Sequence, residues 1–365
     1  MGFRCGIVGL PNVGKSTLFN ALTKTASAQA ANFPFCTIEP NIGDVAVPDA
    51  RLDQLAQIAK SAQSIPARLS FVDIAGLVRG ASKGEGLGNQ FLANIREVDA
   101  IAHVVRCFED GDITHVEGVI DPLADSDTVE TELMLADLES LEKREVNLRK
   151  KVAAKDKAAS AELELVELAL AELREGRPAR KAIVPDDQKL AFKNLQLITS
   201  KPVIYVCNVE ESAADSGNSL SAKMQEKAAA EGAEAVIISA RIEEELAQLD
   251  DDERLEYLNS LGLEEPGLNR LIRQGYELLG LITYFTAGPK EARAWTIRKG
   301  MSAPQAAGVI HTDFERGFIK AETIAFDDYT AHNGEAGARE AGRLRQEGKE
   351  YLVKDGDVLL FRFNV

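Results

Sequence analysis

Near its N-terminus the chain reads Gly9-Leu10-Pro11-Asn12-Val13-Gly14-Lys15-Ser16. This run has the pattern G-x-x-x-x-G-K-[ST] of a phosphate-binding P-loop. The apolar run Cys5-Gly6-Ile7-Val8 before it predicts a short buried strand, and Ser16 to Thr25 predicts the start of a helix. Strand, glycine-rich loop and helix follow in the order that phosphate binding requires, because the loop amides and the helix N-terminus then point at one anion. We therefore expect an α/β nucleotide-binding domain.

Each P-loop residue has an expected role. The side chain of Lys15 should reach the β- and γ-phosphates and so take part in catalysis, and the Ser16 hydroxyl should ligate Mg²⁺. The glycines let the backbone N–H groups curl around the phosphates. The expected phosphate-binding residues of this loop are Asn12, Val13, Gly14, Lys15, Ser16 and Thr17.

Length and composition exclude several classes of protein. The chain has 365 residues, enough for two or three domains, and its 45% hydrophobic content supports sizeable cores. No apolar run approaches the ~18 residues of a membrane-spanning helix, so we expect no membrane partner. Strand residues lead straight into the P-loop, so no signal peptide is expected. The cysteines are far apart, which favours reduced thiols in a cytoplasmic protein over a zinc site or a disulfide framework. They are Cys5, Cys36, Cys107 and Cys207.

The chain is acidic, with a net charge of −16 from 42 basic and 58 acidic residues, but the charge is uneven. Residues 201–280 hold 17 acidic and 7 basic residues, whereas residues 143–157 hold seven basic and two acidic ones. A globally acidic protein can still present a local basic surface, so the overall charge does not exclude a nucleic-acid partner.

Apolar strand candidates alternate with helical segments over much of the chain. This alternation predicts a doubly wound, mostly parallel sheet. After the first strand, the candidates are residues 68–73, 100–105, 202–207 and 235–238.

A helical insertion separates the strand expected at residues 100–105 from the one expected at residues 202–207. From Thr128 onward, apolar residues recur at 4-3-4-3-4 spacing with one polar interruption, and a second helix has 3-4-3 spacing. We expect an antiparallel hairpin that turns near residues 155–160 and ends at Arg177-Pro178. Since two such helices can bury each other's seam, the hairpin requires no dimer, and a monomer is expected. The two seams are Met134, Leu138, Leu141, Glu145, Leu148 and Val152, and Leu163, Val166, Leu170 and Leu173.

Residues 281–365 have a different pattern, in which short strand candidates are separated by glycines. Strands are expected at 294–297, 318–324, 351–353 and 358–363, and helices near 302–310 and 333–347. This pattern predicts a small α+β domain with a mixed sheet. The expected domains are therefore a nucleotide-binding domain (1–127 and 201–280), the inserted hairpin (128–200) and the C-terminal domain (281–365).

A second motif, Asp73-Ile74-Ala75-Gly76, closes one strand and matches D-x-x-G. After a P-loop, the aspartate of this motif is expected to hold Mg²⁺ through water, and the Gly76 amide to sense the γ-phosphate. Upstream, Thr37 follows Asn32-Phe33-Pro34-Phe35-Cys36 and is poised to complete the Mg²⁺ shell. An ordinary loop hydroxyl is the alternative for Thr37.

Together these motifs resemble the translation-factor-related class of G proteins, and the Asn-Phe-Pro-Phe-x-Thr loop resembles the Obg subgroup. Where that subgroup carries Asn-Lys-x-Asp, this chain has Asn208-Val209-Glu210-Glu211. The chain is similar over essentially its whole length to the YchF (Obg-like ATPase) family. The resemblance extends to the helical insertion and to a C-terminal region that looks like a TGS domain. It implies a preference for ATP, and the ribosome or its RNA as the partner.

The altered base-recognition element argues by itself for lost guanine specificity. The usual aspartate accepts hydrogen bonds from guanine N1–H and N2–H₂, a pair that adenine lacks. Glu211 is longer and displaced, and a carboxylate against adenine N1 would repel it, so we expect Glu211 to point away from the base. Asn208 can still serve N7 and N6–H₂, and Val209 leaves an apolar contact. Losing a required hydrogen-bonding pair forfeits discrimination of up to about 10⁴–10⁵. The backbone at Ser239 and Ala240, after the last strand, is expected to touch the base.

The hydrolytic groups also depart from the common plan. Leu77 follows Gly76, where many GTPases place a glutamine that orients water. His115, in a polar loop, matches a histidine of the family and is our candidate catalytic group, with a solvent-exposed loop histidine as the alternative. The resemblance further implies that Asn12 helps to bind K⁺, which would replace the charge of an arginine finger.

We therefore expect a Mg²⁺-dependent ATPase that acts as a slow, nucleotide-controlled switch. One alternative is a GTPase translation factor, and another is a scaffold that binds nucleotide with negligible turnover. Residues 143–157 with Arg174, Arg177, Arg180 and Lys181 are expected to form a basic partner-binding face, or else an ordinary solvated helix surface.

Overall fold

The computed structural model describes residues 3–30, 42–74, 87–110 and 120–364. Thr37, Gly76, Leu77 and His115 lie outside these ranges, so the structure does not place them. No helix in the described ranges is long and apolar enough to cross a membrane.

The chain forms two compact units. The first comprises Met1–Asp44 and Ser70–Leu271, and the second comprises Val45–Leu69 and Ile272–Val365. Residues 45–69, which the sequence places in the nucleotide-binding domain, pack within the second unit. The reason is strand pairing: β3 (Ser64–Ile65) adds to β9 (Ala292–Arg298) as a parallel edge strand.

The first unit is built on a six-stranded sheet in the order β2-β4-β1-β5-β6-β7. Pairing is parallel between β1 and both of its neighbours, between β5 and β6, and between β6 and β7. Since β1 has β4 on one side and β5 on the other, the strand order reverses direction at β1, and ligands of such sheets bind at the carboxyl ends beside that point. The strands are β1 (Arg4–Val8), β2 (Ile42–Ala46), β4 (Arg68–Asp73), β5 (Ala100–Arg106), β6 (Val203–Asn208) and β7 (Glu234–Ile238).

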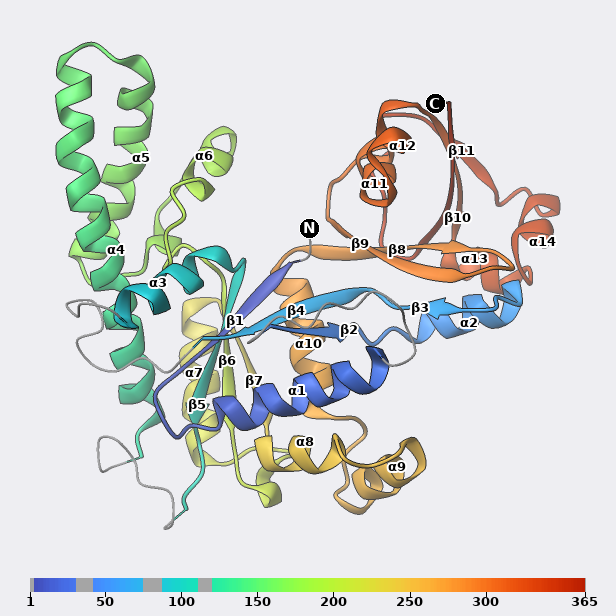
Figure 1. Cartoon of the computed structure of the whole chain (residues 1–365), viewed down its shortest axis with the longest axis horizontal. Helices are drawn as coiled ribbons and strands as arrows, with labels where there is room; N and C mark the ends of the chain where they lie inside the picture. Colours follow the sequence, from blue (N-terminus) through green and yellow to red (C-terminus); the bar gives the residue numbers. More distant parts are fainter. Residues whose placement is uncertain (1–2, 31–41, 75–86, 111–119, 365) are drawn as a thin grey trace. The chain divides into compact units, whose positions relative to one another are not determined.

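Helices lie on both faces of this sheet, and in Figure 1 α1 lies in front of the strands and α7 behind them. Strands β5 and β6 are buried along their whole length, as expected for central strands covered on both faces. The predicted doubly wound α/β domain is therefore confirmed. The helices of this unit outside the insertion are α1 (Lys15–Ala30), α3 (Leu87–Glu97), α7 (Ser219–Glu231), α8 (Ala240–Leu246), α9 (Asp251–Ser260), α10 (Gly267–Leu278, which continues into the second unit) and the short turn η4 (Glu211–Ala213).

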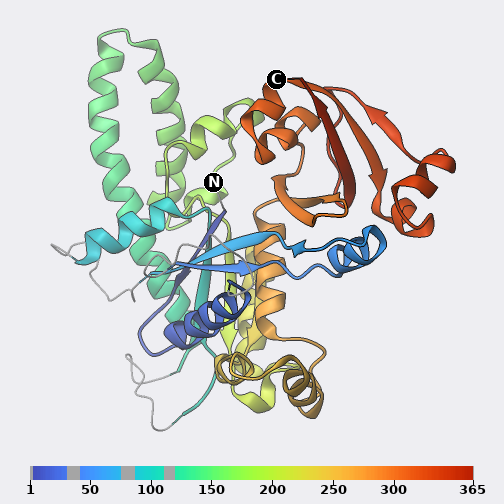
Figure 2. The same ribbon diagram turned by 45° about the vertical axis from the view of Figure 1, so that its right-hand side comes forward.

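The insertion is the predicted antiparallel hairpin of α4 (Pro122–Ala153) and α5 (Lys157–Arg174), which run side by side in Figures 1 and 2. The heptad seams pack against each other in one apolar cluster that includes Leu141, Leu148 and Leu170. Helix α4 begins earlier than expected because Asp121 caps it and Pro122 occupies its first turn. After α5 follow η2 (Ala179–Lys181), η3 (Asp186–Gln188) and α6 (Lys189–Lys193).

A buried carboxylate joins the two ends of the insertion. Asp137 on α4 is fully buried, and its oxygens accept hydrogen bonds from the backbone of Ile198 (3.0 Å) and Thr199 (2.8 Å) and from the Thr199 hydroxyl (2.8 Å). Burial raises the pKa of Asp137, whereas these hydrogen bonds and Arg96 oppose the rise. The contacts hold the point where α4 leaves the sheet next to the point where the chain returns to β6.

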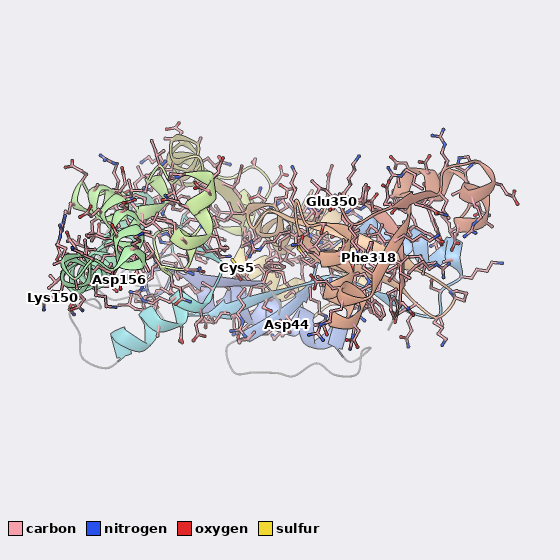
Figure 3. The ribbon with its side chains drawn as sticks, turned by 90° about the horizontal axis from the view of Figure 1, so that it is seen from above. Cys5, Asp44, Lys150, Asp156, Phe318 and Glu350 are labelled. Carbon is pink, nitrogen blue, oxygen red and sulfur yellow. The ribbon has the colours of Figure 1, made fainter. Side chains whose placement is uncertain are left out.

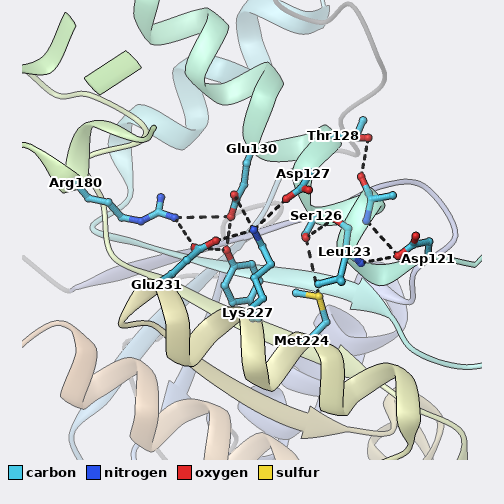
Figure 4. Close-up of polar contacts among 12 residues, drawn as sticks. Asp121, Leu123, Ser126, Asp127, Thr128, Glu130, Arg180, Met224, Lys227 and Glu231 are labelled. Atoms are coloured by element: carbon cyan, nitrogen blue, oxygen red, sulfur yellow. Dashed lines mark hydrogen bonds and ion pairs between the residues drawn. The ribbon is translucent and has the colours of Figure 1, made fainter. Parts of the chain in front are cut away.

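A second polar network, formed by residues nearer the start of α4, secures the same region (Figure 4). Lys227 on α7 donates to Glu231 (2.6 Å) and Asp127 (3.0 Å), and its ammonium lies 3.5 Å from Glu130. The Tyr205 hydroxyl on β6 bonds both Glu130 and Glu231. Because these groups come from α4, α7 and β6, the network ties the root of the hairpin to the sheet.

The second unit contains a mixed sheet in the order β11-β10-β12-β8-β9-β3, as the sequence predicted for the C-terminal region. One face carries an apolar cluster in which Tyr284 and Leu359 pack against Ala303 and Ala307 of α11. The elements not yet given are α2 (Ala50–Ala59), β8 (Leu281–Ala287), α11 (Ala303–Ile310), α12 (Thr312–Arg316), β10 (Phe318–Ala325), α13 (Phe326–Ala331), α14 (Glu335–Glu340), β11 (Arg345–Glu347) and β12 (Asp357–Phe363).

Two expectations for this unit are wrong. Residues 333–347 form the short α14 followed by β11, not one helix, because Ala341 and Gly342 end α14 and the chain then pairs with β10. Residues 351–353 form no strand and contribute a single bridge between Leu352 and Ser302.

Candidate functional site

The P-loop follows β1 directly and owes its course to two glycines with positive φ angles. Gly9 has φ 153°, and a Cβ there would lie 2.4 Å from the Val104 carbonyl oxygen. Gly14 has φ 95°, and a Cβ there would lie 2.3 Å from Nδ2 of Asn208. Both distances are shorter than a real Cβ tolerates, so the loop can pass this close to β5 and β6 only with glycine at these positions.

Lys15, the first residue of α1, carries a buried positive charge. Its side chain is only 7% exposed, and its ammonium donates to the carbonyl of Leu10 (2.6 Å) within the same loop. Burial lowers the pKa of Lys15 to about 8, and the nearby Asp73 carboxylate opposes this shift. Such an ammonium, held in place and partly stripped of water, interacts strongly with an added anion.

Asp73 lies at the carboxyl end of β4, next to Ile7 of β1 in the sheet register. Burial raises the pKa of Asp73, and the Lys15 charge lowers it. A cation near this carboxylate would offset the cost of burying it. The structure thus brings Lys15 and Asp73 together, as the two motifs predicted.

Oxygen atoms suited to Mg²⁺ are present here. The Ser16 side chain is exposed at the start of α1, and Asp73 supplies a carboxylate. Within the described ranges, no group of three or more His, Cys, Asp and Glu side chains is placed to hold a metal ion. This donor set fits Mg²⁺, which usually takes one or two protein oxygens and completes its shell with substrate phosphates and water.

A cavity of about 480 Å³ opens beside the P-loop. Four separate segments form it: the P-loop with the start of α1, the chain after β5, the loop after β6 and the loop after β7. It brings together all five of the base-site residues that the sequence singled out, and three of the phosphate-site residues. Its lining includes Asn12, Gly14, Thr17, Asn208, Val209, Glu211, Ser239 and Ala240, and also Phe108, Glu109, Asp110, Glu210 and Arg241.

Asn208, the last residue of β6, links two walls of this cavity. Its Nδ2 donates to the carbonyl of Val13 (2.9 Å), and its Oδ1 accepts from the backbone N–H of Ala240 (2.9 Å). Each end of the amide has one further hydrogen-bonding position, since the NH₂ has a second proton and the oxygen a second lone pair. Asn208 can therefore hold the loops in place and still contact a purine edge.

The Glu211 carboxylate is engaged by a neighbouring cation. Its Oε1 lies 2.8 Å from Nε of Arg241, the residue that follows Ala240 at the start of α8. The two side chains are 39% and 76% exposed, so the pair is at the cavity rim, not in its floor. Val209 is buried, and its N–H bonds to the carbonyl of Ile238.

Sequence reasoning missed Arg106 and Phe108. Arg106 ends β5 and is only 1% exposed, and its guanidinium donates to the carbonyls of Phe108 (3.2 Å) and Asp110 (3.2 Å). The same guanidinium lies 4.6 Å from the centre of the Phe108 ring. Arg106 thus shapes the cavity wall at Phe108–Asp110. The available signal was an arginine at the end of a strand that is apolar apart from His103.

Comparison with known proteins gives full-length relatives. The chain is 58% identical to the "Ribosome-binding ATPase YchF" of Haemophilus influenzae, 57% to that of Escherichia coli O157:H7 and 54% to that of Bacillus subtilis, in each case covering 100% of both chains. The chain belongs to the YchF family. This confirms the resemblance inferred from the motifs.

Two family models match separate parts of the chain. A model described as 50S ribosome-binding GTPase matches residues 4–136, and the model of the YchF GTPase C-terminal region, described as a protein of unknown function, matches residues 281–364. The assignment of this C-terminal region as a TGS domain stays a prediction.

Solved structures support the same fold. The Schizosaccharomyces pombe YchF GTPase superposes with a TM-score of 0.89 at 40% identity, covering 99% of this chain and 98% of that one. A GTP-binding protein from Pyrococcus horikoshii superposes with a TM-score of 0.62 at 18% identity, covering 99% and 100%, and shares the fold. The predicted P-loop G domain of the YchF type is therefore confirmed.

Proposed function

We propose that this YchF-family protein is a cytoplasmic, Mg²⁺-dependent enzyme that hydrolyses ATP to ADP and phosphate and acts as a nucleotide-controlled switch on the ribosome. Three full-length relatives at 54–58% identity carry the name ribosome-binding ATPase. The P-loop, Lys15 and Asp73 supply the groups that bind a triphosphate and its metal ion.

The pairing of Glu211 with Arg241 carries the preference for ATP. Guanine specificity requires a carboxylate free to accept from N1–H and N2–H₂, and here the carboxylate at the corresponding place lies 2.8 Å from Nε of Arg241. The buried amide of Asn208 keeps one donor and one acceptor position, which match N7 and N6–H₂ of adenine. The base site therefore keeps the Asn208 amide, which can bond to adenine, whereas the Glu211 carboxylate, which guanine would need, is paired with Arg241.

Each of the chain's own groups has a role at the phosphates. Lys15 would exchange its bond to the Leu10 carbonyl for bonds to phosphate oxygens, and Ser16 and Asp73, together with Thr37, would hold Mg²⁺. When bound, Mg²⁺ neutralises charge on the β- and γ-phosphates. The Gly76 amide senses the γ-phosphate, and His115 accepts a hydrogen bond from the attacking water in the absence of a glutamine after Gly76. Asn12 would hold a K⁺ ion that supplies positive charge beside the phosphates.

A GTPase is the second candidate, since the S. pombe relative and the family model for residues 4–136 are both described as GTPases. Direct titration of the purified protein with ATP and GTP, in Mg²⁺ and K⁺, distinguishes the two. Tighter ATP binding is the expected result. GTP binding that is tighter by tenfold or more would overturn the role given to Glu211 and Arg241.

Turnover and ribosome binding need separate measurements. Phosphate release by the wild type and by His115→Ala tests hydrolysis, and negligible release by the wild type would leave a nucleotide-binding scaffold. Co-sedimentation with purified bacterial ribosomes tests the partner, with ATP and ADP compared because a switch binds its partner differently in the two states.

A further inference from the structure

The basic side chains of the α4–α5 hairpin fall into two groups. Along the shaft, which we define as residues 139–149 and 161–177, each basic residue is paired with a carboxylate. The closest pairs are Lys143–Glu139 (2.6 Å), Arg144–Glu162 (2.6 Å), Arg149–Glu167 (2.6 Å), Arg174–Glu145 (3.0 Å) and Arg177–Glu172 (2.6 Å). The shaft therefore holds eight acidic residues against five basic ones and offers no net positive surface.

The tip, defined as residues 150–160, differs. It holds four lysines, all exposed: Lys150, Lys151, Lys155 and Lys157. Among the described residues, none of the four forms an ion pair within 4.0 Å. The only acidic residue of the tip is Asp156, and its carboxylate accepts from the N–H groups of Ala158 (3.0 Å) and Ala159 (3.1 Å) as the cap of α5. Lys150 and Asp156 are labelled on the hairpin in Figure 3.

Helix stability does not account for this composition. Lys150 and Lys151 occupy the last turn of α4, where cations interact favourably with the helix dipole. Lys157, however, opens α5, where a cation is unfavourable. Lys155 has φ 66°, a conformation that favours glycine or asparagine. Two of the four lysines therefore occupy positions where another residue would suit the fold better.

The chemistry of the tip favours RNA over an acidic protein surface. Protein interfaces have an apolar core, and none of the large exposed apolar side chains of the described chain falls within residues 150–160. Lysines on long stems without aromatic neighbours match phosphate groups, which they contact irrespective of base sequence. On a chain with a net charge of −16, a tip with four lysines and one aspartate repels a polyanion less than the acidic remainder of the chain does.

We propose that the tip of the hairpin binds the phosphate backbone of RNA through Lys150, Lys151, Lys155 and Lys157, and that the ion-paired shaft does not. The proposal rests on the proposed function, because it names the surface by which this protein meets the RNA of the ribosome.

Two variants with equal change in charge test the proposal. The tip variant is K150Q/K151Q/K155Q/K157Q, and the matched shaft variant is K143Q/R144Q/R174Q/R177Q. Both remove four positive charges from exposed or half-exposed positions of the same hairpin. Circular dichroism and thermal melting of the full-length proteins verify that both fold.

The readout is the affinity for a 20-base-pair RNA duplex and for purified bacterial ribosomes between 50 and 200 mM KCl. Each phosphate contact contributes about 0.7–0.9 to the slope of log K against log salt, so the tip variant should lose about 3 units of slope. Its RNA affinity at 50 mM KCl should fall at least tenfold. The shaft variant should stay within threefold of the wild type.

The outcomes separate this proposal from the proposed function. A tip variant that binds RNA and ribosomes as the wild type does, with an unchanged slope, overturns the tip proposal and leaves ribosome binding intact. Loss of ribosome binding in the tip variant, with no RNA binding by the wild type, assigns the tip to a protein partner and also overturns it. A wild type that binds RNA but not ribosomes contradicts the ribosome assignment. The salt dependence of RNA binding by the tip variant, compared with the wild type, then still tests whether the tip binds RNA.

Discussion

The two ends of the nucleotide site are built differently. The phosphate end comes from the contiguous stretch Gly9–Ser16, joined by Asp73 from the neighbouring strand. The base end is assembled from three distant segments, and Asn208 reaches across 195 positions to Val13 and 32 positions to Ala240. Most of the phosphate end is thus specified by one contiguous motif. The base end, in contrast, forms only when the sheet brings distant segments together.

The charges at the two ends also differ in burial. Lys15 is 7% exposed, whereas Arg241 at the base end is 76% exposed. Because water screens exposed charges, substitutions at the phosphate end should have large effects and those at the rim of the base end small ones.

Replacing Lys15 tests the buried phosphate end, where we expect the largest effect. Lys15→Ala removes a positioned donor from a water-poor site, so we expect kcat for phosphate release to fall by about 10²–10³. Lys24→Ala, an exposed lysine on the same helix, is the control and should leave kcat unchanged. A Lys15→Ala enzyme within tenfold of the wild type would contradict the role of the phosphate end.

Asn208→Ala tests whether the base end depends on its buried links. The change leaves the Val13 carbonyl and the Ala240 N–H without their partner, so the free energy of unfolding should fall by about 2–4 kcal/mol. Affinity for ATP and GTP should fall together, by roughly 10–100-fold, since both loops move. Denaturant unfolding and nucleotide titration measure the two effects, with exposed Asn259→Ala as the control. A loss of affinity for only one of the two nucleotides would show that Asn208 contacts the base and does not hold the loops in place.

The pH dependence of nucleotide binding tests whether the charged form of Lys15 contacts the phosphates. Burial lowers its pKa from 10.5 to about 8, so between these values the folded chain binds fewer protons than the unfolded chain, and this group's contribution to stability rises with pH. Phosphates favour the charged form, so nucleotide affinity should be full below pH 8 and about tenfold lower at pH 9. Titration calorimetry at pH 8.5 in two buffers should detect proton uptake, and a pH-independent affinity up to pH 9 would refute the assignment.

The smallest effect is expected at the exposed rim. Arg241→Ala frees the Glu211 carboxylate, and because exposed ion pairs contribute at most about 1 kcal/mol, the ratio of GTP to ATP affinity should rise about fivefold or less. Competition between the two nucleotides measures this ratio, and Lys223→Ala, exposed on α7, is the control. A fall in the ratio would mean that Arg241 opposes ATP, contrary to the proposal.

Most of the fold followed from patterns that are local in sequence. The strands of the first unit and the hairpin seam were predictable because apolar periodicity fixes which faces are buried. The extra pairing of Ser64–Ile65 with β9 was not predictable, since two residues carry no periodic signal and their partner lies 228 positions away. The helix expected at 333–347 was wrong because β11 is a short edge strand that long-range pairing with β10 defines.

The same distinction applies to the site. The roles of Lys15 and Asp73 rest on motifs at the carboxyl ends of two adjacent strands, one following β1 and the other closing β4, so the sequence could place them together. Arg106 was missed because its partners are backbone carbonyls, which no residue pattern records. The pairing of Glu211 with Arg241 was likewise invisible, although the expectation that Glu211 turns away from the base agrees with it.

The grip of Asp137 on Ile198 and Thr199 has a consequence for the evolution of this chain. Since the two ends of the insertion are clamped together at its base, sixty residues between them can lengthen, shorten or be exchanged while the sheet keeps its geometry. Loop-closure entropy grows only with the logarithm of length, so such changes cost little once the clamp is in place. The clamp thus separates the geometry of the sheet from the length of the hairpin, so the distance at which the tip is held from the sheet can change without altering the nucleotide site.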